Sequence, residues 1–265
     1  MKNAFFLITA MLFSLSLFQS CVKKESDATV VATAEDLAAN AGFSDQIDLA
    51  ANVAIEERGG GGACPIVTLE KPWGTWPNTL TIDYGTDGCA GPNGTNILKG
   101  KLIISQTADA FTKGATRTLR FENFYVDAIQ VEGVQSWTNN GLNSAAQWSF
   151  TKVAKDMKVS YPDGTATSWN LTHTSTLTQG GLTLTWWDDV WSTTGTISGV
   201  NREGVSYSAT TTADLVKKAT CGWVSAGAID LNVGGNTAVI DYGGGDCDNK
   251  ASVTLPNGDT FTIKL

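Results

Sequence analysis

The sequence predicts an all-β domain, either an antiparallel β-sandwich or a partly closed barrel, with two related halves that are each clasped by a disulfide. Residues 63–265 are rich in Thr, Gly, Trp, Tyr, Val and Ile and are interrupted by Asn-Gly, Asp-Gly and Gly-Gly pairs. Several segments alternate apolar and polar residues with the period of a β-strand. A stretch bounded by two cysteines near the start of this region recurs near its end.

Residues 1–20 are predicted to be a lipoprotein signal peptide. A basic residue, Lys2, is followed by an apolar run, and Ser20 stands directly before Cys21. A Cys at this point resembles the lipobox of bacterial lipoproteins, so we expect Cys21 to be acylated and to become the new N-terminus. One alternative is an ordinary signal peptide cut nearby, with Cys21 a thiol. Another is a transmembrane anchor, although the run is shorter than the roughly 20 apolar residues that a spanning helix needs.

The charge of the chain limits its partners. Removal of residues 1–20 takes one of the 18 basic residues, so that 17 remain against 26 acidic residues and the formal charge becomes −9. An acidic chain without clustered Lys and Arg is a poor match for nucleic acid. Anionic lipid headgroups would also repel it, so we expect membrane attachment through the lipid anchor.

Residues 21–62 are predicted to form a lipidated acidic tether, flexible or partly helical. The segment is rich in Ala, Asp and Glu. Ser44 is a plausible helix N-cap before a loosely amphipathic stretch that ends near Glu56. A mostly disordered spacer is the alternative, and Gly59–Gly62 is predicted to be a flexible break.

Within residues 63–265 the strands are predicted as successive hairpins. Residues 157–161 alternate in polarity up to a Pro-Asp-Gly turn, and residues 169–177 alternate on the return strand. After a Gly-Gly turn, residues 182–186 read as a further strand, and residues 195–212 read as another hairpin. One apolar and one polar face indicate antiparallel strands that cover a core.

An internal duplication relates residues 64–105 to residues 221–265. Both copies contain Ile-Asp-Tyr-Gly, with the second cysteine six residues after the Asp, and the cysteine spacings are 25 and 26. With Cys21 acylated, four cysteines remain, and the duplication favours the pairs Cys64–Cys89 and Cys221–Cys247. An oxidising envelope would preserve both bonds. Cross-pairing between the copies and zinc binding are the alternatives, and zinc fits poorly without Cys-x-x-Cys spacing.

Several strings resemble those of β-rich envelope lipoproteins of the Bacteroidetes type, a group with no established activity. The strings are Arg120–Val126, Trp187–Val190, Gly199–Gly204 with Tyr207, Cys221–Trp223, and Asp241–Gly243 running into Cys247–Ala251. The resemblance covers most of residues 64–265 and implies an envelope or surface location. It implies no catalytic residue.

The sequence contains few candidates for catalysis or metal binding. His173 is the only histidine and is expected to be half-buried on a strand. Neither a His-based metal site nor a Cys-His nucleophile therefore has the residues that it needs. Gly-rich turns of the two copies place acids together, and hard carboxylate oxygens there make calcium a candidate ligand. The alternative is that these acids form Asx-turns. The acids concerned are Asp83, Asp87, Asp241, Asp246 and Asp248.

Exposed tryptophans suggest contact with glycans. The chain has nine Trp, and flat aromatic rings beside polar side chains suit sugar rings. The alternative is that these rings fill the core and the hairpin ends. Asp188 and Asp189 are adjacent, so on a strand they would point to opposite faces and could not flank one glycosidic bond. The candidate binding residues are Trp73, Trp76, Trp187, Trp191, Asp188 and Asp189.

These observations predict a lipoprotein of the bacterial outer membrane, facing the periplasm or the cell surface, with a non-catalytic binding or structural role. Glycans and envelope proteins are the candidate partners. The first alternative is an envelope glycoside hydrolase with carboxylates drawn from separate strands. The second is a scaffold for a partner protein, which would present an apolar patch or a strand edge.

Overall fold

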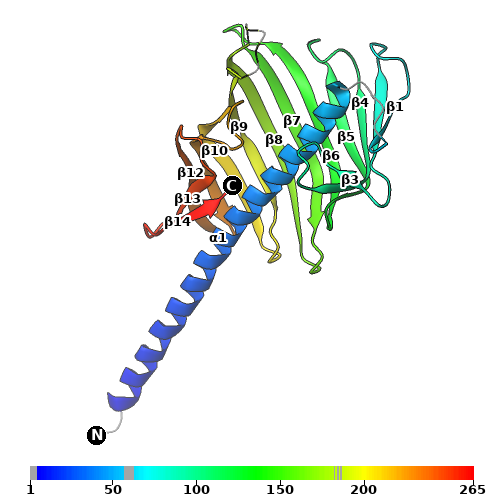
Figure 1. Ribbon diagram of the computed structural model, residues 1–265. Coiled ribbons are helices and arrows are strands. Elements are labelled where there is room, and N and C mark those ends of the chain that lie inside the picture. The colour runs from blue at the N-terminus through cyan, green and yellow to red at the C-terminus, as the bar shows by residue number, and fades with distance from the viewer. Residues whose placement is uncertain (1–4, 57–62, 182, 184, 186) are drawn as a thin grey trace.

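The computed structural model describes residues 5–56, 63–181, 183, 185 and 187–265, and only the backbone of residues 5–25. In this part of the chain one long helix precedes a series of strands (Figure 1). The elements are α1 (Phe5–Glu56), β1 (Ile66–Leu69), β2 (Asn78–Asp83), β3 (Cys89–Ala90), β4 (Ile97–Gln106), β5 (Thr116–Val126), β6 (Ile129–Leu142), β7 (Trp148–Ser160), β8 (Ala166–Gln179), β9 (Val190–Val200), β10 (Ser206–Lys218), β11 (Ala226–Val233), β12 (Asn236–Gly244), β13 (Lys250–Thr254) and β14 (Thr260–Lys264).

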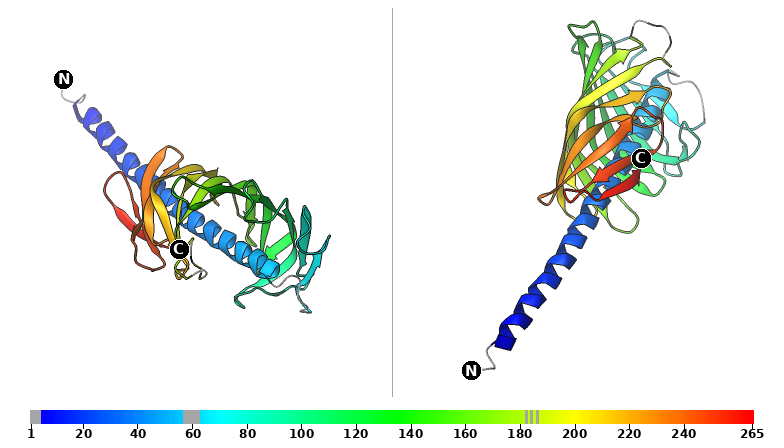
Figure 2. Two further views of the ribbon diagram at one scale, coloured as in Figure 1. Left: turned by 90° about the horizontal axis from the view of Figure 1, so that it is seen from above. Right: turned by 90° about the vertical axis from the view of Figure 1, so that its left-hand side faces the viewer.

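The strands form one antiparallel sheet in which neighbours in the chain are neighbours in space. The order runs from β1 and β2 through β4 to β14, and β3 pairs with β4 beside this path. The sheet is not closed, and it curves around α1 when seen from above (Figure 2). The predicted all-β antiparallel class with two disulfides is therefore confirmed.

The predicted hairpins agree with the strands except at one connection. The Pro-Asp-Gly turn joins β7 to β8, and β9 and β10 form the hairpin expected within residues 195–212. The strand predicted over residues 182–186 is not found at Thr183 or Thr185. Both threonines instead donate hydrogen bonds to Asp188, at 3.0 and 3.1 Å, which holds an irregular connection. Residues 182, 184 and 186 lie outside the described residues.

The segment predicted as a tether is helical as far as Glu56, and from Val30 onward the helix packs into the core. Val30, Ala34 and Ile47 are almost fully buried against the inner, concave face of the sheet. The helix continues through Ser44 instead of beginning there. Its N-terminal part extends away from the sheet (Figure 1). The predicted break at Gly59–Gly62 lies outside the described residues.

A stripe of polar residues along α1 faces the sheet. Its members recur every fourth residue and therefore lie on one side of the helix: Asp36, Asn40, Ser44, Asp48 and Asn52. Their hydrogen-bond partners lie in turn in the β9–β10 turn, β8, β7 and β5, so α1 crosses the strands diagonally. No helix in the described part of the chain is both long and apolar enough to cross a membrane.

Candidate functional site

Both disulfides have the pairing that the duplication favours. Cys64 bonds Cys89 with a Cα–Cα distance of 6.0 Å, and Cys221 bonds Cys247 with a distance of 5.7 Å. The two copies lie at opposite ends of the sheet, because one contributes β1 to β4 and the other β11 to β14. The side chain of Cys21 is outside the described residues.

The two copies repeat one local structure. Asp83 Oδ1 accepts a hydrogen bond from Gly85 N at 2.8 Å, and Asp241 Oδ1 accepts one from Gly243 N at the same distance. These are Asx-turns, in which the carboxylate closes the loop after the strand. Between Asp83 and Gly85, Tyr84 is buried, and burial raises its pKa to about 12. Ile-Asp-Tyr-Gly therefore forms the same turn at each end of the sheet.

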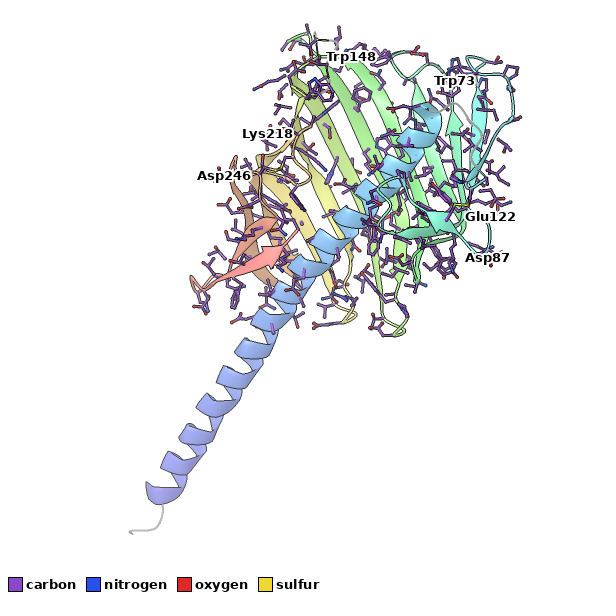
Figure 3. All side chains as sticks on the ribbon, viewed as in Figure 1. Trp73, Asp87, Glu122, Trp148, Lys218 and Asp246 are labelled. Carbon is purple, nitrogen blue, oxygen red and sulfur yellow. A yellow bond between two sulfur atoms is a disulfide. The ribbon has the colours of Figure 1, made fainter. Side chains whose placement is uncertain are left out.

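The acids proposed for calcium are separated or already engaged. Asp87 and Asp246 lie on opposite sides of the molecule (Figure 3). Asp83 lies 3.4 Å from the Lys101 ammonium, and Asp248 Oδ1 accepts a hydrogen bond from Lys250 N. The described residues contain no group of three or more His, Cys, Asp or Glu side chains that could hold a metal ion. Asp83, Asp241 and Asp248 instead form Asx-turns, which is the alternative to a calcium site.

The candidate tryptophans do not form a flat platform. Trp73 and Trp76 meet edge to face, with ring centroids 6.2 Å apart and planes at 66°. Trp187 is 58% exposed, whereas Trp191 is half-buried and its ring centroid lies 5.9 Å from that of Phe150. Trp73 lies in the β1–β2 connection and Trp148 at the start of β7, at separate places along the upper edge of the sheet in Figure 3.

Asp188 and Asp189 shape the connection between β8 and β9. Asp188 accepts the hydrogen bonds of Thr183 and Thr185. Partial burial and the neighbouring Asp188 raise the pKa of Asp189. The hydrogen bonds of Asp188 have a structural role, because they hold the turn next to exposed Trp187.

A row of polar and aromatic side chains crosses the inner face of the sheet beneath α1. Its members are direct cross-strand neighbours from β4 to β8, and we call them the inner row: Gln106, Arg117, Trp137, Lys152 and His173. The Lys152 ammonium lies 5.0 Å from the centre of the Trp137 ring and 2.9 Å from Asp48 Oδ2 on α1. Burial, with the nearby charge of Lys152, lowers the pKa of His173 to about 4.

A partly enclosed cavity of about 200 Å³ lies between the inner row and the C-terminal end of α1. Its walls include Ile104, Leu119, Trp137 and Phe150, so most of its lining is apolar. Asp48, Asn52, Arg117 and Asn139 add polar groups. Mostly apolar walls with a few convergent polar groups are typical of small-molecule sites.

Burial shifts the pKa values of two charged groups that line this cavity. Burial raises the pKa of Asp48, and the neighbouring Lys152 opposes that change. Burial lowers the pKa of Arg117, and Asp48 opposes that change. Asp48 Oδ1 is buried and has no hydrogen-bond partner among the described residues. The cavity therefore contains an acceptor and a guanidinium that are incompletely satisfied.

The opposite face of the sheet carries a shallow hollow of about 510 Å³ across β7 to β10. Small hydroxyl side chains line it, among them Thr172, Thr196, Ser198 and Ser208, and Lys155 and Asp156 also contribute. None of its lining residues is aromatic, so it offers no ring on which a sugar could stack.

Neither the cavity nor the inner row was recognised in the sequence. One signal was available in β5, where Arg117 shares the inward alternation of buried Leu119. Charged residues on an apolar face need a specific partner. No protein-family model, curated protein or solved structure matches the chain.

Proposed function

We propose that the chain is a lipid-anchored protein of the bacterial outer membrane, facing the periplasm or the cell surface, with a non-catalytic binding or structural role. The observation that carries the proposal is the cysteine pairing. Two disulfides use four of the five cysteines, which leaves Cys21, three residues after the end of the apolar run at Phe18. An acylated N-terminal cysteine is expected to be the unpaired one. Disulfides also persist best in an oxidising compartment.

The positions of the carboxylates support a non-catalytic role over a glycoside hydrolase. A hydrolase needs two acids across a cleft, about 5 to 10 Å apart. Among the described residues, the cavity beneath α1 is lined by one carboxylate, Asp48, and the hollow on the opposite face by one, Asp156. Asp188 is engaged in a turn.

We propose that the surface of the protein contacts glycans through single exposed Trp rings instead of through a coplanar pair of Trp rings. Trp187 and Trp73 are 58% and 41% exposed. Each stands in an irregular connection beside polar side chains, where one ring can stack on one sugar. A glycan array probed with the mature protein tests this proposal. We expect binding that falls in W187A or W73A and persists in W223A, whose ring is also partly exposed. An array without a hit would refute it.

The anchor is tested by labelling cells with an alkyne fatty acid. We expect label on the wild-type protein and on S20A, and none on C21A. Intact mass under non-reducing conditions should show two disulfides, no free thiol and a lipid mass on Cys21. An unlabelled wild-type protein with a free thiol at Cys21 would refute the proposal.

A further inference from the structure

The guanidinium of Arg117 lies at the cavity beneath α1 without a bonded carboxylate. It donates hydrogen bonds to Asn52 Oδ1 at 3.0 Å and to Gln106 Oε1 at 3.3 Å. Both acceptors are neutral amide oxygens. Among the ion pairs between described residues, none includes Arg117. The charge that acts on it is that of Asp48, whose carboxylate is paired directly with Lys152. A largely buried cation without a directly bonded anion is unfavourable, because neutral acceptors replace only part of its lost hydration.

Other cations that the sheet turns toward α1 are paired with acids of that helix. The pairs are Arg202 with Asp36, Lys152 with Asp48, and Lys217 with Asp45. At Arg117 the polar stripe of α1 presents Asn52 in place of an acid. The cavity borders this position, since both Arg117 and Asn52 line it. The position that lacks a direct ion-pair partner for Arg117 therefore coincides with the unfilled volume.

The remaining walls of the cavity restrict which anion would fit. Ile104, Leu119, Trp137 and Phe150 present apolar and aromatic surface. A doubly charged phosphate would need several more donors than Arg117 supplies. Asp48 Oδ1 would also disfavour a highly charged ligand, although Lys152 neutralises much of its charge. A singly charged head with an apolar tail satisfies both parts of the cavity.

We propose that the cavity binds a small monocarboxylate with a short aliphatic or aromatic tail. The carboxylate pairs with Arg117, and the tail lies against Trp137 and Phe150. The bound carboxylate thus gives Arg117 the ion-pair partner that acids of α1 give to the other cations. A cavity volume of about 200 Å³ suits a molecule of benzoate or hexanoate size, since an apolar protein cavity of about 150 Å³ binds benzene. This site does not depend on acylation of Cys21 or on glycan contact.

Calorimetric titration of the full-length protein in a zwitterionic detergent tests the site. The probes are benzoate and hexanoate, with benzyl alcohol as the neutral analogue of benzoate. We expect saturable 1:1 binding of at least one carboxylate, with a change in tryptophan fluorescence because Trp137 forms a wall. Benzyl alcohol should bind at least about tenfold more weakly, because it cannot form the charge-assisted pair.

Two variants and a matched control separate this site from non-specific uptake. R117Q should weaken carboxylate binding about 10- to 100-fold. R120Q is the control, because Arg120 is exposed and lies on the outer face of the same strand. N52D supplies an internal carboxylate to Arg117, so it should raise the melting temperature and weaken ligand binding as R117Q does.

Several results would overturn the proposal. They are the absence of binding by both carboxylates, equal binding of benzyl alcohol, and equal loss in R117Q and R120Q. N52D keeps the test decisive if R117Q does not fold, because it adds an ion pair instead of removing one. Unchanged affinity in a folded N52D would also refute the site.

Discussion

His173 occupies the last position of the inner row, where folding keeps its imidazole neutral. Its pKa falls from an ordinary 6.5 to about 4, first because of burial and second because of the Lys152 charge. Between these values the unfolded chain binds a proton that the folded protein does not. The contribution of His173 to stability is therefore complete above pH 6.5 and is lost as the pH falls toward 4, by up to about 3 kcal/mol.

Replacement of His173 by Gln should flatten this part of the pH dependence. We expect the free energy of unfolding of the wild type to fall more steeply than that of H173Q between pH 7 and pH 4.5. Urea unfolding at both pH values measures the two slopes, and acids common to both proteins cancel in the comparison. Parallel slopes would show that His173 is not kept neutral by the fold.

Asp36 connects α1 to the β9–β10 turn and is only 3% exposed. Its Oδ1 accepts from Arg202 Nε at 2.6 Å, and its Oδ2 accepts from Arg202 N at 2.9 Å. The Arg202 guanidinium also lies 4.9 Å from the centre of the Tyr161 ring. The carboxylate thus satisfies a backbone N–H as well as a partly exposed cation.

Removal of this carboxylate should destabilise the protein. We expect D36A to lower the free energy of unfolding by about 2 kcal/mol, mainly because the Arg202 N–H loses its partner. The exposed neighbour provides the control, and E35A should change stability by less than about 0.5 kcal/mol. Chemical denaturation of both variants compares them directly, and equal stabilities would contradict the role assigned to Asp36.

At the scale of elements, α1 approaches the sheet closely through small side chains. Ala34 is fully buried and Ala50 nearly so, whereas Ala39 is exposed. A34L should destabilise the protein by about 1 to 3 kcal/mol, because added methylene groups in a packed interface force neighbours apart. A39L is the matched control, since Leu and Ala have similar helix propensities. Thermal unfolding measures both, and equal melting temperatures would place α1 off the sheet in solution.

Most of the hairpins were predictable, although the strand expected over residues 182–186 is not found at the residues described there, whereas the position of α1 was not predictable. Residues 169–177 of β8 alternate clearly because one face of the sheet is buried. The face of α1 that meets the sheet carries Asp36, Asn40 and Asp48, so it resembles a solvated surface. Only pairing with Arg202, Thr167 and Lys152 makes that stripe a buried interface. The cavity site depends on the same contacts, which join residues that are distant in the sequence.

At the scale of the molecule, docking of α1 shortens the connection between the proposed anchor and the sheet. Val30, the first almost fully buried side chain described, lies nine positions after Cys21. That connection spans about 14 Å as a helix and about 30 Å if fully extended. An acylated Cys21 would therefore hold the sheet close to the bilayer instead of on a long flexible spacer.

The end of the sheet formed by β11 to β14 should face the membrane. Helix α1 contacts β11, β12 and β14, and its N-terminal part leaves the sheet on this side (Figure 1). We expect fluorophores attached at N257C, in the β13–β14 turn, to transfer energy efficiently to a lipid dye in vesicles. Fluorophores at T75C, in the β1–β2 connection at the other end, should transfer less. Ten Gly and Ser residues inserted after Ser26 should remove the difference. Equal transfer from both positions without the insertion would mean that α1 does not set the orientation of the sheet.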